Sequence, residues 1–145
     1  MIRKLFQISI PFVWFGAVAA ISFMEAPLKF QAPGITIPLG LGIGRLVFYA
    51  LNWIEIVLAV VLLTSFVFGR EFIGRVAWTL FGLILVILIA ETFWLLPVLD
   101  ARAVQVISGT ADPFSKLHFF YIGFDAVKLV LLFSLGVVMV RRHVR

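Results

Sequence analysis

The chain has 145 residues, of which 63% are apolar and only 13% are charged. Soluble domains are about 45–50% apolar and about 25% charged, so the composition excludes an ordinary soluble domain and predicts one integral membrane domain, residues 1–145. The absence of cysteine excludes disulfides and thiolate chemistry. The net charge of +5 gathers at the predicted membrane edges, which indicates the bilayer and anionic lipid as partners and no nucleic acid.

Four apolar stretches are long enough to cross a bilayer. A hydrocarbon core about 30 Å thick requires about 20 apolar residues of helix. The stretches cover about residues 5–27, 46–68, 76–96 and 119–140. The sequence therefore predicts an all-α fold, a transmembrane four-helix bundle.

The segments between these spans carry helix-breaking residues. Residues 31–44 contain two prolines and four glycines, so we expect them not to continue a helix. Residues 97–113 form the longest polar segment. Within it, Val98–Ile107 is predicted to be a short surface helix that stops at Ser108-Gly109-Thr110.

The distribution of lysine and arginine predicts the topology. Seven of these residues lie at the two termini and in the second loop, against four in the first and third loops. The seven are Arg3, Lys4, Arg70, Arg75, Arg141, Arg142 and Arg145. Because cytoplasmic segments are richer in such residues, we expect both termini in the cytoplasm. We expect the membrane to be a bacterial inner membrane, with anionic lipid at its cytoplasmic face.

Four of the seven acidic residues lie inside the predicted spans, one on each helix. They are Glu25, Glu55, Glu91 and Asp125. An aspartate at the centre of a membrane helix costs about 2.5–3.5 kcal/mol on insertion scales, and such residues usually face one another, water or a cation. The four acids are therefore the first candidates for a functional site.

Helical spacing predicts that these acids meet in the outer half of the bundle. Glu91 lies roughly 9 Å from the outer end of its helix, and Glu55 roughly 14 Å. On the last helix, His118, Tyr121, Asp125 and Lys128 are spaced to share one face. The predicted site consists of Glu25, Glu55, Glu91, His118 and Asp125, and the residues expected around it are Asn52, Tyr121 and Lys128.

The formal charges of this set do not cancel. Four carboxylates face one lysine and one histidine, which leaves a deficit of two or three positive charges. Protons, a bound metal ion, or a guanidinium from Arg45 or Arg102 can each cover it. Simpler interpretations are also open. Asp125 and Lys128 can form an intrahelical ion pair that Glu55 shares, and Glu25 and His118 can lie at the aqueous interface.

A metal site is the leading interpretation, because bundles that hold metals supply inward carboxylates and histidines from several helices. These ligands suit iron, manganese or zinc, whereas haem is disfavoured because only His118 is well placed as an axial ligand. An iron or manganese site would make an oxidoreductase, and zinc a hydrolase with a metal-activated water. The sequence assigns no catalytic residue.

Two other functions are open: a proton- or ion-coupled small transporter, and a non-catalytic accessory subunit of a membrane complex. The sequence is also compatible with assembly of the chain into a homo-oligomer or with a partner membrane subunit. The apolar inner half of the bundle argues against an open path for ions within one subunit.

Short glycine, proline and aromatic motifs recur along the chain in a characteristic order. They are Gly16, Phe23 and Pro27 in the first span, Gly44-Arg45 and Phe48 in the second, Leu96-Pro97 ending the third, and Phe114 and Leu117-His118 opening the fourth. In this order the chain resembles a family of small bacterial four-helix membrane proteins related to eukaryotic transmembrane protein 205. The resemblance implies a four-helix bundle and no particular chemistry. The four membrane acids lie outside the family's pattern.

Overall fold

The computed structural model describes residues 2–69, 73–113 and 116–144, and every regular element in these ranges is helical. In chain order the elements are α1 (Ile2–Val18), the π-helix η1 (Ala19–Glu25), α2 (Ala26–Leu28), the 3₁₀ turn η2 (Lys29–Gln31), α3 (Ile37–Val67), α4 (Arg75–Ala90), the π-helix η4 (Glu91–Leu95), α5 (Leu96–Ile107) and α6 (Lys116–Val144). Arg70, Arg145 and Phe114, used in the topology and family arguments, lie outside the described residues.

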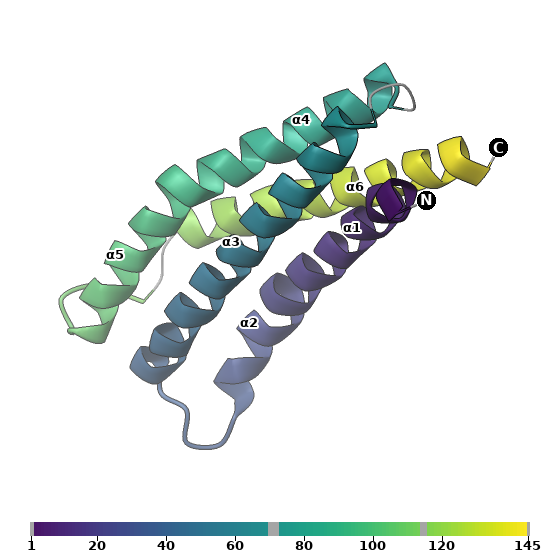
Figure 1. Cartoon of the computed structure of the whole chain (residues 1–145). Helices are drawn as coiled ribbons and strands as arrows, with labels where there is room; N and C mark the ends of the chain where they lie inside the picture. The colour runs from purple at the N-terminus through teal and green to yellow at the C-terminus, as the bar shows by residue number, and fades with distance from the viewer. Residues whose placement is uncertain (1, 70–72, 114–115, 145) are drawn as a thin grey trace.

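These elements join into four rods, each long and apolar enough to cross a membrane (Figure 1). The rods are Ile2–Gln31, Ile37–Val67, Arg75–Ile107 and Lys116–His143. The prediction of an all-helical, four-span bundle is confirmed at this level. Each rod is longer than its predicted span, because the helix continues through residues that were assigned to the loops.

The start of the second rod corrects the prediction that residues 31–44 cannot be helical. α3 begins at Ile37, with Pro38 in its first turn. A first-turn backbone N–H has no partner within the helix, so proline is accepted there. Thr36 caps the helix, since its Oγ1 accepts a hydrogen bond from Leu39 N at 3.3 Å. Only the segment 32–36 breaks the helix.

The third rod also continues past its predicted end. α5 follows η4 directly, and Pro97 lies in its first turn. The predicted helix over Val98–Ile107 exists, but it extends the membrane rod and is not a separate surface helix. It stops where predicted, because Gly109 adopts a φ of 74°, a conformation that glycine accepts readily.

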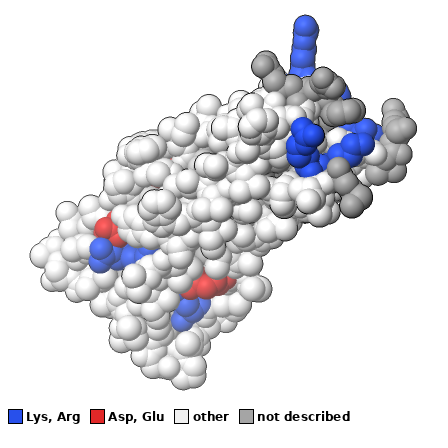
Figure 2. Space-filling model, in the orientation of Figure 1, with Lys and Arg blue, Asp and Glu red and all other residues white. Residues whose placement is uncertain are grey.

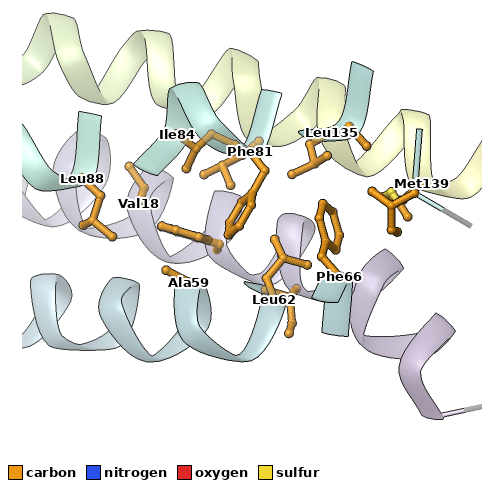
Figure 3. Close-up of a cluster of buried hydrophobic side chains, with 14 of the residues drawn as sticks. Val18, Ala59, Leu62, Phe66, Phe81, Ile84, Leu88, Leu135 and Met139 are labelled. Carbon is orange, nitrogen blue, oxygen red and sulfur yellow. The ribbon is translucent and has the colours of Figure 1, made fainter. Parts of the chain in front are cut away.

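The rods pack around an apolar core that fills the half of the bundle nearer the termini. α6 contacts α1 and α4, and α1 contacts α3. Figure 3 shows buried side chains from all four helices interlocking along the bundle axis. Its labelled members are Val18, Ala59, Leu62, Phe66, Phe81, Ile84, Leu88, Leu135 and Met139.

The two ends of the bundle differ in charge. Both termini lie at one end, and Figure 2 shows lysine and arginine side chains gathered there without red neighbours in this view. At the opposite end, blue and red atoms lie next to each other. Near the termini, Gln7 Nε2 donates to Ser65 O at 2.8 Å, and Gln7 Oε1 lies 2.8 Å from His143 Nε2. These contacts join α1, α3 and α6.

Candidate functional site

Three of the four predicted acids converge on one lysine inside the bundle. Lys128 Nζ lies 2.7 Å from Glu55 Oε2 and 2.9 Å from Asp125 Oδ1. The same ammonium donates a hydrogen bond to Glu91 Oε2. All four side chains are at most 2% exposed. We call Glu55, Glu91, Asp125 and Lys128 the carboxylate–lysine cluster.

The cluster joins three helices in a way that the sequence predicted only in part. Glu55 lies on α3, Glu91 begins η4, and Asp125 and Lys128 lie one turn apart on α6. The intrahelical pair of Asp125 and Lys128 is confirmed, and so is the sharing of this lysine by Glu55. The contact of Glu91 with Lys128 was missed, because the two residues lie on different helices and spacing along one helix does not reveal such a pair.

Trp14 is a further member of the site that the sequence interpretation missed. Its Nε1 donates a hydrogen bond to Glu55 Oε2 at 2.7 Å, and its side chain is completely buried. Tryptophan in membrane helices is commonly an anchor at the membrane–water interface. A tryptophan midway along a helix, away from both interfaces, was the signal for a buried hydrogen-bond donor. Through Trp14, all four rods contribute to the site.

A neutral hydrogen bond flanks the cluster. The Thr92 hydroxyl has two acceptors within reach. Its Oγ1 lies 2.8 Å from Asn52 Oδ1 and 2.7 Å from Leu88 O, and the single hydroxyl proton is donated to one or the other. Asn52 precedes Glu55 by one turn of α3, and Thr92 directly follows Glu91. The prediction that Asn52 belongs to the surroundings of the acids agrees with this contact.

Several buried oxygens of the cluster have no hydrogen-bond partner among the described residues. They are Glu91 Oε1 and both carboxylate oxygens of Asp125, although Asp125 Oδ1 forms the ion pair with Lys128. Buried polar atoms are almost always hydrogen-bonded, and the exceptions concentrate at sites with a chemical role or an additional bound group. These oxygens are the positions where a proton or a cation would bind.

Glu25 and His118 lie apart from these contacts. Glu25 Oε2 forms an ion pair with Lys29 Nζ at 3.3 Å and is one quarter exposed, which agrees with its interpretation as an interfacial residue. His118 is exposed near the start of α6. Tyr121 is buried, with its ring 5.2 Å from that of Phe48 in an edge-on contact.

The two arginines considered as counter-ions bind other acidic residues of the chain. Arg45 Nε lies 2.5 Å from Asp100 Oδ1, and Arg45 NH2 donates to Asp100 Oδ2 at 3.1 Å. This bidentate pair joins α3 to α5. Arg102 NH2 donates to Asp112 O at 3.0 Å. The arginines therefore brace the end of the bundle opposite the termini.

Both π-helices lie beside the polar residues, and each has the same local cause. η1 and η4 each end two residues before a proline, Pro27 or Pro97. At the end of each, a backbone N–H bonds five residues back, from Ala26 to Ile21 and from Leu96 to Glu91. The wider turn accommodates a proline that cannot donate and that crowds the preceding turn. π segments occur frequently at functional sites.

The carboxylate geometry bears on the predicted metal site. Among residues 2–69, 73–113 and 116–144, no group of three or more histidine, aspartate or glutamate side chains is arranged to hold a metal ion. The three cluster carboxylates do converge on one point, but the Lys128 ammonium occupies it. A metal there would have to displace the lysine. The metal site with Glu25, Glu55, Glu91, His118 and Asp125 stays a prediction.

Comparisons of the chain with models of protein families, with curated proteins and with solved structures found no match. The resemblance to the family related to transmembrane protein 205 therefore stays a prediction.

Proposed function

We propose that the protein is a small proton-coupled transporter, in which the carboxylate–lysine cluster binds and releases the protons. The observation that carries this proposal is the convergence of three buried carboxylates on one buried ammonium. Intramembrane ionisable residues that face a bundle interior commonly serve as proton relays or ion sites.

The charges of the cluster support proton binding. If all four groups are ionised, two negative charges remain uncompensated in an interior from which water is excluded. Burying an uncompensated charge is far more costly than burying a neutral, hydrogen-bonded group. Carboxylates that share protons remove that cost, and the oxygens of Glu91 and Asp125 that lack donors can accept them.

The two π-helices support a change of shape during transport. Glu91 is the first residue of η4, and η1 begins at a similar distance along the first rod. Breaks in transmembrane helices recur at the substrate and ion sites of transporters. The opposite half of the bundle is closed by the apolar core and by the contacts of Gln7 with Ser65 and His143. Transport therefore requires this half to open, and the Gln7 contacts to break.

The proton step can be tested without knowing the substrate. Infrared difference spectroscopy between mildly acidic and mildly alkaline buffer should show the carbonyl stretch of a protonated carboxyl group, and Glu91→Gln should change that band. Asp112→Asn, in an exposed loop, is the matched control and should leave the band unchanged. A spectrum with no band that depends on Glu55, Glu91 or Asp125 would refute proton exchange by the cluster.

Transport itself is tested in liposomes. The wild-type protein should dissipate an imposed pH gradient faster than Glu91→Gln does, and Asp112→Asn should behave as the wild type. Equal rates for wild type and Glu91→Gln would contradict the proposal. Such a result, together with co-purification of a larger membrane complex, would favour an accessory subunit.

Metal-dependent chemistry is a second candidate, favoured by the convergence of three carboxylates from three helices on one point. In this case a cation such as iron, manganese or zinc replaces the Lys128 ammonium. Elemental analysis of purified protein decides the question. If a metal binds at this point, the purified protein should contain it in stoichiometric amount. Lys128→Met should then increase the metal content, because the lysine competes with the metal for the same oxygens. Metal content at background level in both proteins would exclude this candidate.

We further propose that the termini face the cytoplasm of a bacterial inner membrane. The exposed basic residues at the terminal end support this orientation, since positive charge is enriched on cytoplasmic segments. The chain has no cysteine, so single cysteines report on sidedness. A membrane-impermeant maleimide should label Ser108→Cys in intact cells, whereas Arg141→Cys should be labelled only after lysis. The reverse pattern would invert the topology.

A further inference from the structure

A cavity of about 420 Å³ opens at the end of the bundle opposite the termini. Small-molecule sites typically occupy about 300–1,000 Å³. Residues from η1, α2, η2, α3, α5 and α6 line it. Tyr121 belongs to this lining and lies one helical turn before Asp125 on α6. The cavity therefore adjoins the carboxylate–lysine cluster through Tyr121.

Most of the lining is apolar, and a few polar groups interrupt it. The apolar walls include the rings of Phe23, Phe30 and Phe48 and the aliphatic side chains of Leu96, Leu99 and Ile122. The polar side chains are Ser22, Lys29, Arg45, Tyr49, Asp100, His118 and Tyr121. A predominantly apolar site with a few convergent polar groups fits a molecule with an apolar body and a small polar head.

The charges in the cavity wall are already paired. Lys29 forms its ion pair with Glu25, and Arg45 forms its bidentate pair with Asp100. The Lys29 ammonium also lies 5.4 Å from the ring centre of Phe30 and 5.5 Å from that of Phe48, distances at which an aromatic face stabilises a cation. The wall therefore has no excess charge for a charged ligand to neutralise. This balance favours an uncharged molecule.

Ser22 supplies a free donor in the same wall. It lies in η1, the residue is only 9% exposed, and its Oγ has no hydrogen-bond partner among the described residues. Leaving a buried hydroxyl unpaired is unfavourable. A ligand oxygen that accepts a hydrogen bond from Ser22 Oγ would remove this penalty.

We infer that this cavity binds an uncharged amphipathic molecule with a carbonyl or hydroxyl head group. Its oxygen accepts a hydrogen bond from Ser22 Oγ, and its apolar body lies against the phenylalanine and leucine side chains. We also infer that this molecule is the transported substrate, and that part of the inference rests on the proposed function. The binding itself needs no proton gradient.

Photo-crosslinking tests the inference on the purified chain in lipid nanodiscs. The probe is a tetradecan-2-one that carries a diazirine in its chain, and labelled peptides are mapped by mass spectrometry. We expect labelling at residues 96–103 of α5 and 44–49 of α3, with competition by excess tetradecan-2-one. Tetradecane should compete at least tenfold more weakly, because it lacks the oxygen, and tetradecanoate should also compete more weakly, because its charge has no free partner.

Two variants and a control separate the site from general partitioning into lipid. Ser22→Ala should weaken competition by the ketone about tenfold, which corresponds to about 1.4 kcal/mol, and should leave competition by tetradecane unchanged. Ala103→Phe fills part of the cavity and should abolish labelling there. Ser134→Ala, on α6 and outside the cavity lining, should behave as the wild type.

Three results would overturn the inference: equal competition by ketone and alkane, stronger competition by tetradecanoate than by the ketone, or labelling of these segments that persists in Ala103→Phe. The test also separates this inference from the proposed function. Specific ketone binding without any proton exchange by the cluster refutes proton coupling and leaves the ligand site standing. Proton exchange without specific binding refutes the ligand site alone.

Discussion

Removal of the Lys128 ammonium is the perturbation that tests the cluster most directly. Lys128→Met keeps a long, flexible side chain in the same space but leaves three carboxylates without their common counter-ion. Removing one partner of a buried ion pair costs about 3–5 kcal/mol. The three contacts do not add, because they share one ammonium. We therefore expect a loss of about 3–5 kcal/mol in the free energy of unfolding.

Reversible unfolding by sodium dodecyl sulfate in mixed micelles, followed by circular dichroism, measures this loss. Lys116→Met is the matched control, since this lysine lies exposed at the start of the same helix, and it should change the unfolding free energy little. Adding Glu91→Gln to Lys128→Met should restore part of the lost stability, because the double variant has fewer carboxylates without a counter-ion than Lys128→Met alone.

The loss should also shrink as the pH is lowered, because a protonated carboxyl group needs no counter-ion. If Lys128→Met unfolds like Lys116→Met at every pH, Lys128 does not neutralise the buried acids. If Glu91→Gln, added to Lys128→Met, lowers the unfolding free energy further instead of raising it, the carboxylates are not the source of the destabilisation. Either outcome would remove the basis for proton binding by the cluster.

Three further substitutions test individual contacts by the same unfolding measurement. Trp14→Phe removes the donor to the Glu55 carboxylate and should cost about 1.5–3 kcal/mol, typical of a hydrogen bond to a charged group; an unchanged stability would contradict that bond. Thr36→Ala removes the cap of α3 and should cost about 1 kcal/mol, whereas no loss would mean that water replaces the cap. Arg45→Gln should change stability little, because its pair with Asp100 is partly exposed, and a large loss would show that this pair is shielded from water.

Composition and periodicity were sufficient for the class of fold. Long apolar stretches must be helical in a bilayer, because only a helix satisfies its backbone hydrogen bonds within one segment. The sequence also identified the face of α6 that carries Asp125 and Lys128, since residues three and four apart share one side of a helix. The rod ends were less predictable. Pro38 and Pro97 were interpreted as breaks, yet both lie in first turns, where proline is tolerated.

The four intramembrane acids could be found from the chain alone, because a carboxylate in hydrocarbon is costly wherever it occurs. Their grouping was decided by the tertiary structure. Glu55 and Glu91 meet Lys128 across helices, whereas Glu25 pairs locally with Lys29. Spacing along a helix gives the depth and the face of a residue, but not which faces of neighbouring helices meet. That choice depends on how the side chains of all four rods pack together, and it placed a lysine at the point where the sequence predicted a metal.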